Sequence, residues 1–267
     1  MNSSLENLVN LDRYPIDRLN DKAGLSLLSQ CRTQMGDVGA CLLDDFIPTQ
    51  VVEKIVSDTH SLTPLAHHNS NCNTTPYQES VDPQEQTEHP RKSPRTTSVH
   101  VIAYDSIPHD SEIRQLYESQ QLLAFIAAVL EVPVLYRYAD RLAGLNIAVN
   151  MAGDHNGWHF DQCDFVTSVL LREAEIGGQF QFVPNIRNSN EENYPSVRKV
   201  LDGQHDKILT LPMKAGSLAI FKGRHSIHRV TRIEGFNPRM VALLGYDTEP
   251  GVLMTESARL RRFGRVA

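Results

Sequence analysis

The sequence predicts a mainly β protein, a sandwich or barrel of the jelly-roll kind with helices packed against its outside. Three observations support this fold class. From Gly144 onward, short apolar or alternating runs recur at near-regular spacing between Gly, Pro, Asn and Asp turns. Before that point, apolar residues recur mainly at helical three- and four-residue spacing. Hydrophobic residues make up 40% of the chain and charged residues 22%, as in packed globular proteins.

The first part of the chain, residues 1–143, is expected to be helical with a few strands, within a single domain that spans residues 1–267. Gly36 and Gly39 are expected to end the first helix, and Pro48 with Thr49 to start the second after a short strand. The pattern later predicts a strand over 98–105, an amphipathic helix over 111–131 and a short strand over 134–138.

Residues 64–97 interrupt this pattern. They are rich in Pro, Asn, Thr, Gln and charge and show no periodicity, so we expect a long loop that is either a lid or disordered. As a lid, its basic residues Arg91, Lys92 and Arg95 could pair with a substrate carboxylate. His67, His68 and Cys72 do not have the spacing of a closed zinc site, and a solvated loop accounts for them.

The second part, residues 144–250, is expected to form the β core. The predicted strands are 145–152, 157–162, 165–172, 178–184, 207–213, 217–223, 228–233 and 239–247. Many short strands separated by turns are typical of a sandwich or barrel.

The net charge of −6 argues against nucleic acid as a partner, and no apolar run is long enough to span a membrane. The first residues lack a basic start and an apolar signal run, so a cytoplasmic location is expected, with reduced cysteines. A small molecule is the expected partner.

One short stretch carries candidate metal ligands. His159 and Asp161 are two residues apart in a predicted strand, so both side chains point to the same face. A non-haem iron site needs two histidines and one carboxylate on one face. His225 and His228 are both candidates for the second histidine, and we favour His228 because a strand holds an imidazole more rigidly than a turn.

Arg239 is the candidate for binding an organic acid. It follows the turn after His228, at the start of the next predicted strand, where an antiparallel return would place it beside His228. A guanidinium there could hold a carboxylate through two parallel hydrogen bonds.

These segments resemble a known family. "WHFD", "GGQFQFVPNIR" and "FKGRHSIHRVTRIEGFNPRMV" together are similar to the iron(II)/2-oxoglutarate-dependent oxygenases, whose pattern is H-x-D, a distal His, and an Arg or Lys beyond it. More narrowly, "LVNLDRYPID", "TSVHVIAYDSIP", "VLYRYAD" and the longer run from Gly157 to Pro184 resemble the bacterial subfamily of free-amino-acid halogenases and hydroxylases. The similarity extends from about Leu8 to the C-terminus.

The resemblance implies a double-stranded β-helix, also called a cupin-like jelly roll. It implies iron(II) held by His159, Asp161 and His228, with 2-oxoglutarate and O2 as co-substrates and Arg239 on the distal carboxylate of 2-oxoglutarate. Radical halogenases of the subfamily have Gly or Ala in place of the carboxylate ligand, which leaves a position for a halide. Because Asp161 is retained, hydroxylation of a free amino acid or derivative is expected rather than halogenation.

Other residues have two interpretations each. Asn150 and Thr231 could bind the co-substrate or belong only to strand ends, and Gln162 could contact the substrate or be a surface amide. Trp158 faces away from His159, which favours core packing over a substrate contact. Two other functions stay open, an oxygenase acting on a peptide- or carrier-bound residue and a non-catalytic barrel that binds or senses a ligand.

Overall fold

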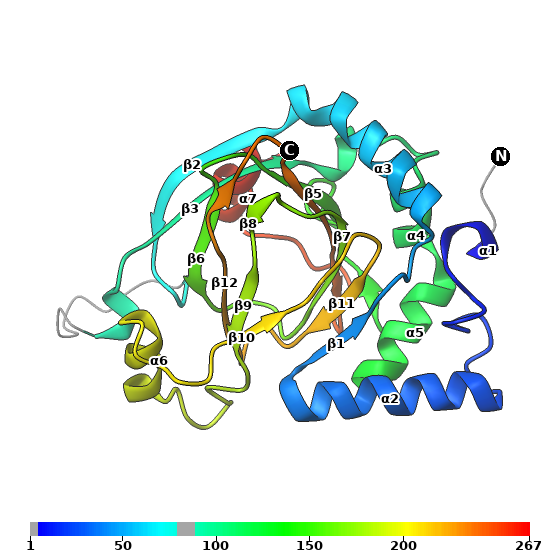
Figure 1. The fold of residues 1–267 in the computed structure, drawn as a ribbon, viewed down its shortest axis with the longest axis horizontal. Coiled ribbons are helices and arrows are strands. Elements are labelled where there is room, and N and C mark those ends of the chain that lie inside the picture. Colours follow the sequence, from blue (N-terminus) through cyan, green and yellow to red (C-terminus); the bar gives the residue numbers. More distant parts are fainter. Residues whose placement is uncertain (1–4, 79–88) are drawn as a thin grey trace.

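The computed structural model describes residues 5–78 and 89–267. Its main feature is one large antiparallel sheet that curls into a nearly closed barrel (Figure 1). The strands of this sheet are β1 (Ala40–Leu43), β2 (His67–Thr74), β3 (Arg95–Ile102), β5 (Leu145–Asn150), β6 (His155–His159), β7 (Val166–Arg172), β9 (Phe180–Val183), β10 (Leu209–Leu211), β11 (Leu218–Phe221), β12 (Ile227–Val230) and β14 (Arg239–Leu244). The predicted mainly β, jelly-roll fold is therefore confirmed.

Strand order shows how the barrel is wound. The order is β1-β11-β7-β14-β5-β3-β6-β12-β9-β10, with β2 added against β3, so most neighbours in the sheet are distant in sequence. Two small antiparallel pairs lie apart from it, β4 (Tyr136–Arg137) with β15 (Tyr246–Asp247), and β8 (Ile176–Gly177) with β13 (Ile233–Glu234).

The alternation of side chains along each strand separates an interior from an exterior. In β5, Asn146, Ala148 and Asn150 line the barrel interior, whereas Leu145, Ile147 and Val149 belong to the hydrophobic core outside it. The neighbouring strand β14, which pairs with β5, repeats the pattern, with Arg239, Val241 and Leu243 toward the interior. On these two strands the interior face therefore alternates with the apolar face, and the main core lies between this wall and the helices.

Helices cover the barrel on two sides. They are α1 (Leu5–Leu8), α2 (Lys22–Val38), α3 (Thr49–Leu62), α4 (Glu112–Glu118), α5 (Gln120–Leu130), α6 (Tyr194–Leu201) and α7 (Glu256–Phe263), with short 3-10 turns η1 (Thr63–Leu65), η2 (Pro90–Lys92) and η3 (Tyr104–Ser106). Helices α2 to α5 lie on one side, α6 on the opposite side, and α7 against β2 and β3 (Figure 1). Within the described ranges, no helix has the length and apolar character needed to cross a membrane.

Two helix boundaries differ from the prediction. Gly36 lies inside α2, and only Gly39, in the left-handed conformation with φ 66°, ends it. The single helix predicted over 111–131 is divided at Ser119, whose extended backbone ends α4 and whose hydroxyl caps α5.

The prediction of a long loop over residues 64–97 is wrong for much of this segment. Residues 67–74 form β2, which pairs antiparallel with β3, and β3 begins at Arg95. The sequence of β2 shows no apolar alternation because the strand lies at the side of the sheet and has polar residues such as Asn69 and Thr74 toward the interior. Residues 79–88, within the expected lid, lie outside the described part of the chain.

Candidate active site

His159, Asp161 and His228 meet at one end of the barrel. His159 ends β6, and His228 is its direct partner in the neighbouring strand β12. Asp161 lies two residues beyond the end of β6, where its backbone N–H donates to the Gly223 carbonyl at 3.1 Å. His159 Nε2 is 3.8 Å from Asp161 Oδ1, and His228 Nε2 is 3.3 Å from Asp161 Oδ2. The three side chains that the sequence predicts as iron ligands thus converge.

Backbone carbonyls set the tautomer of both imidazoles. His159 Nδ1 lies 2.9 Å from the Gly157 oxygen, and His228 Nδ1 lies 2.9 Å from the Ser226 oxygen. Because a carbonyl can only accept, each Nδ1 carries a hydrogen, and in the neutral ring each Nε2 then has a free lone pair. A backbone carbonyl on the other ring nitrogen is the usual arrangement for metal-binding histidines, and both Nε2 atoms face Asp161.

The electrostatics of the group also fit a cation. Burial, together with the charges of His228 and Arg95, places the pKa of His159 well below its usual range, so its ring is neutral and able to bind a metal. Burial alone would raise the pKa of Asp161, but the interactions of the carboxylate with His228, His159 and Arg95 outweigh it and lower that pKa to about 2. Asp161 Oδ2 is buried and has no hydrogen-bond partner, as a ligand oxygen for a metal would.

Gly223 is a site residue that the sequence analysis missed. A Cβ at this position would lie 1.7 Å from Asp161 Oδ2 and 2.6 Å from its Cγ. Only glycine leaves room for the carboxylate to reach the two imidazoles. The signal would have been a glycine at the predicted end of the strand before His228, but a glycine in a turn is too common to indicate a site.

The three residues open into a cavity of about 530 Å³ inside the barrel. Arg239 opens β14, is 4% exposed, and lines this cavity. Its strand pairs with β5 and β7, so the expected position beside His228 in an adjacent strand is wrong. Strand β12 lies between β6 and β9 instead, and the two residues share the cavity from different parts of the barrel wall.

The side chain of Arg239 forms no hydrogen bond or ion pair with the described residues. Burial lowers its pKa to about 10, and no acidic neighbour offsets this effect. A buried guanidinium without a counterion is costly, and a carboxylate ligand would supply one. The site is therefore suited to an organic acid at Arg239.

Three other predicted site residues line the same cavity. Asn150 is opposite Arg239 in the register of β5 and β14. Arg95 lies in β3 rather than in a loop, and its Nη1 donates to Asn156 Oδ1 at 2.9 Å. Gln162 also lines the cavity, while its Nε2 donates to the Gln78 carbonyl at 3.2 Å.

Two predicted residues do not line it. Trp158 packs in a hydrophobic cluster with Phe160 and the helix α6, and the Arg229 guanidinium lies over its ring at 4.7 Å. Thr231 Oγ1 accepts from the Gln179 N–H at 3.0 Å, away from the cavity. The alternation of faces along β6 and β12 accounts for both positions.

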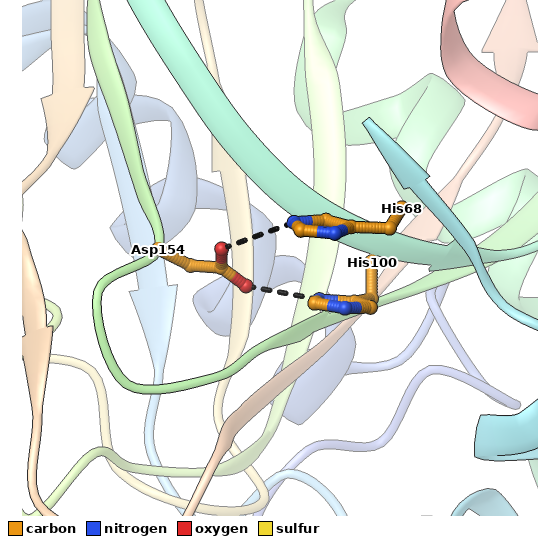
Figure 2. A group of neighbouring side chains, drawn as sticks. All are labelled: His68, His100 and Asp154. Atoms are coloured by element: carbon orange, nitrogen blue, oxygen red, sulfur yellow. Dashed lines mark hydrogen bonds and ion pairs between the residues drawn. The ribbon is translucent and has the colours of Figure 1, made fainter. Parts of the chain in front are cut away.

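A second group of two histidines and one aspartate lies elsewhere in the barrel. His68 of β2 and His100 of β3 stack with ring centroids 3.8 Å apart and 6° between their planes, and both face Asp154 (Figure 2). His68 therefore belongs to a strand and a side-chain cluster, so the expected solvated loop is wrong there.

Hydrogen bonds account for every nitrogen that faces Asp154. His100 Nδ1 donates to Asp154 Oδ2 at 3.1 Å. The Ser98 hydroxyl donates to Asp154 Oδ1 at 2.5 Å, so its lone pair must accept from His68 Nε2 at 3.2 Å. Both nitrogens thus carry hydrogens, and parallel rings cannot direct two in-plane lone pairs to one ion. This cluster is a hydrogen-bonded group as it stands.

Comparisons with known proteins agree with the geometry. The chain matches the family described as Halogenase D over residues 24–258. No curated protein matches it. A 2OG-Fe(II) oxygenase family oxidoreductase from Burkholderia pseudomallei has a similar structure, with 14% sequence identity, a TM-score of 0.52, and a match that covers 84% of this chain and 92% of that one. A prolyl hydroxylase from Trichoplax adhaerens, in complex with a hypoxia inducible factor peptide, has 15% identity and a TM-score of 0.55, and the match covers 86% of this chain and 96% of that one. The epimerase SnoN from nogalamycin biosynthesis, in complex with Fe3+ and alpha ketoglutarate, has 13% identity and a TM-score of 0.55, and the match covers 84% of each chain.

Each of these likenesses is low in sequence identity, so it concerns the fold. The family match covers most of the chain and agrees with the resemblance found in the sequence. The chain therefore belongs to the Halogenase D family, and its fold is that of the 2OG-Fe(II) oxygenases.

Proposed function

We propose that the protein is an iron(II)- and 2-oxoglutarate-dependent dioxygenase that hydroxylates a C–H bond of a small polar substrate, a free amino acid or a derivative of one. The observation that carries this proposal is Asp161 between two imidazoles whose Nε2 lone pairs face it, above a cavity that holds the unpaired Arg239. When bound, iron(II) would supply activation of O2, with 2-oxoglutarate as the reductant.

The reaction balances without a further reagent. One oxygen atom of O2 enters the C–H bond of the substrate as hydroxyl, and the other enters 2-oxoglutarate, which loses carbon dioxide and becomes succinate. His159, Asp161 and His228 would hold the metal, and Arg239 would bind the distal carboxylate of 2-oxoglutarate. Gly223 keeps the space that Asp161 needs.

Asp161 also favours hydroxylation over halogenation, although the family is described as Halogenase D. Three protein ligands on one face of an octahedral metal leave three positions, which bidentate 2-oxoglutarate and O2 would use. A halide would need a fourth open position on the metal, and the Asp161 carboxylate would occupy that position.

The cavity supports a small substrate. Its volume of about 530 Å³ is in the range of small-molecule sites, and it has to hold 2-oxoglutarate as well. Polar side chains of the barrel wall, such as Asn146, Asn150 and Asn156, would supply hydrogen bonds to polar groups of the substrate.

The first experiment is an anaerobic titration of the protein with iron(II) and 2-oxoglutarate. A competent site gives a weak visible charge-transfer band, and His228→Ala should abolish it. A wild-type protein without the band would contradict the proposal and favour a non-catalytic binding barrel.

The second experiment identifies the chemistry. Aerobic incubation with iron(II), 2-oxoglutarate, ascorbate and pooled amino acids should give a product heavier by one oxygen atom, together with succinate. A product that gains chlorine would overturn the argument from Asp161. Succinate formation stimulated only by peptides or carrier-bound residues would replace the free substrate with a bound one.

A further inference from the structure

The C-terminal helix α7 forms part of the cavity wall. Thr255, Ala258 and Arg262 are spaced three and four residues apart, so they share one face of the helix, and all three line the cavity. Phe263 anchors the helix among buried residues of β3, β5 and β14. The helix thus presents Arg262 to the interior from a fixed position.

The arginines near the C-terminus differ in their partners. Arg265 donates to Asp105 Oδ2 at 2.8 Å, and Arg259 Nε lies 3.8 Å from Asp140 Oδ2. Arg262 has a neutral partner instead, because its Nη2 donates to Asn146 Oδ1 at 2.8 Å. No carboxylate of the described residues pairs with Arg262, so its charge faces the cavity without a counterion.

The position of Arg262 is close to the predicted metal ligands. Burial lowers its pKa to about 10, and Asp161 is the one acid whose charge opposes this effect. Asn146 uses one of the five N–H groups of the guanidinium and fixes its plane, which leaves further N–H groups for a ligand. A planar guanidinium held in this way is suited to a carboxylate bound through two parallel hydrogen bonds.

We propose that Arg262, oriented by Asn146, binds a carboxylate of the substrate. The inference rests on the proposed function, in which Arg239 already binds 2-oxoglutarate, so that the charge of Arg262 calls for a different anion. The substrate is therefore an amino acid with a free carboxylate, either the α-carboxylate or one in its side chain. Amidation or esterification of that carboxylate removes the charge and should exclude the molecule.

Acetate is the probe for this site because it carries the carboxylate alone. The anaerobic protein, loaded with iron(II) and saturating 2-oxoglutarate, is titrated with acetate and with neutral acetamide at constant ionic strength while its melting temperature is followed. Acetate should raise the melting temperature of the wild type and acetamide should not, since a ligand of the folded state stabilises it. The shift should vanish in Arg262→Gln and persist in Arg265→Gln, a matched control outside the cavity.

Two results would overturn the inference, an equal acetate shift in Arg262→Gln and no acetate shift in the wild type. If 2-oxoglutarate does not bind at all, the same acetate titration of metal-free Arg239→Gln still tests Arg262. A failure of the proposed function can therefore be distinguished from a failure of the inference about Arg262. The unfolding curve of Arg262→Gln shows whether this variant folds. If it does not, Arg262→Lys replaces it. A weaker acetate shift is expected for that variant, because lysine lacks the planar guanidinium of arginine.

Turnover distinguishes the source of the carboxylate. Glutamate, glutamine and isoglutamine share one skeleton and differ in which carboxylate is free. Of glutamine and isoglutamine, the one in which an amide replaces the carboxylate bound by Arg262 should have a KM at least about 30-fold higher than that of glutamate. This is the effect of deleting one partner of a buried charge pair. Arg262→Gln should raise KM of a substrate found in the pooled assay by a similar factor while KM for 2-oxoglutarate stays within about 3-fold. Equal increases in both would assign Arg262 to 2-oxoglutarate instead.

Discussion

Two clusters of the barrel contain the same three residue types, two histidines and an aspartate, and they differ in where the hydrogens lie. At His159 and His228, backbone carbonyls take the Nδ1 hydrogens, which leaves both Nε2 lone pairs toward Asp161. At His68 and His100, the nitrogens that face Asp154 are themselves the donors. Composition and proximity are therefore insufficient to identify a metal site, because the partner of the second ring nitrogen decides whether a lone pair is available.

The clusters also differ in what they join. Asp154 accepts from Ser98, His100 and the Met151 N–H, the last at 2.8 Å, and so ties β3 to the turn before β6. Asp161 has a buried oxygen with no hydrogen-bond partner and an open cavity in front of it. One aspartate is satisfied by the protein, and the other requires a ligand.

The strongest test of this comparison is metal stoichiometry. His228→Ala should lower the affinity for iron(II) by more than about 100-fold, because loss of a ligand costs more than loss of its outer-shell partner. His100→Ala is the matched control and should retain one ion per chain. Anaerobic calorimetric titration with iron(II) measures the affinity and the stoichiometry of both variants. A second ion in the wild type that is lost in His100→Ala would show that the two clusters are alike after all.

Removing the aspartate of the hydrogen-bonded cluster should affect stability instead. Asp154→Ala removes the acceptor of the Ser98 hydroxyl, of His100 Nδ1 and of the Met151 N–H, which should lower the free energy of unfolding by about 2–4 kcal/mol. Denaturant unfolding of the metal-free protein measures this loss. Iron(II) affinity of the folded variant should stay unchanged, and a smaller loss is expected for Asp154→Asn, which keeps the shape of the side chain.

Space around Asp161 provides a subtler test. Gly223→Ala places a methyl group where the Asp161 carboxylate lies, so the carboxylate must move away from the imidazoles. Iron(II) affinity should fall by about 10-fold or more, as when a ligand loses its orientation, while the protein still folds. Calorimetric titration under anaerobic conditions gives the affinity, and an unchanged value would mean that Asp161 does not bind the metal. Gly36→Ala, inside α2 and with no atom within 4 Å of the new methyl group, is a control for the added side chain.

The smallest expected effect concerns pH. Burial keeps the pKa of His159 well below its usual value, so a falling pH protonates this imidazole only after an ordinary histidine has titrated. From pH 7 to 6, the logarithm of the iron(II) affinity should therefore fall with a slope of at most about one proton per ion. A steeper slope would show that His159 is protonated in the free site, against the effect of its burial. In the metal-free protein the same burial favours unfolding as pH falls below about 6.5, because only the unfolded chain takes up the proton.

Much of the iron-binding group could be predicted from local sequence. The spacing of His159 and Asp161 and the strand position of His228 favour these three residues, although Asp161 lies beyond the end of β6 and its place is set by the loop that follows. The structure agrees, with His228 directly opposite His159. The prediction for Arg239 was correct in placing it at the start of a strand and wrong about its neighbour, since strand order depends on pairings between segments far apart in the chain.

Other features depend on contacts that no local pattern reveals. The strand at residues 67–74 has no apolar alternation, because one of its faces lines a polar interior, so its sequence is similar to that of a loop. Gly223 and Arg262 were missed for a related reason. The importance of each arises from an atom more than sixty residues away in sequence, Asp161 for the glycine and Asn146 for the arginine.

The sequence by itself determined the class of fold and supplied three candidate ligands, because these depend on the period of short segments and on the spacing of a few residues along the chain. Only the tertiary structure decided which cluster of two histidines and an aspartate has its lone pairs free, and which arginines remain in the cavity without a counterion. These depend on the direction of side chains brought together by strand pairing, and direction is set by the packed structure as a whole.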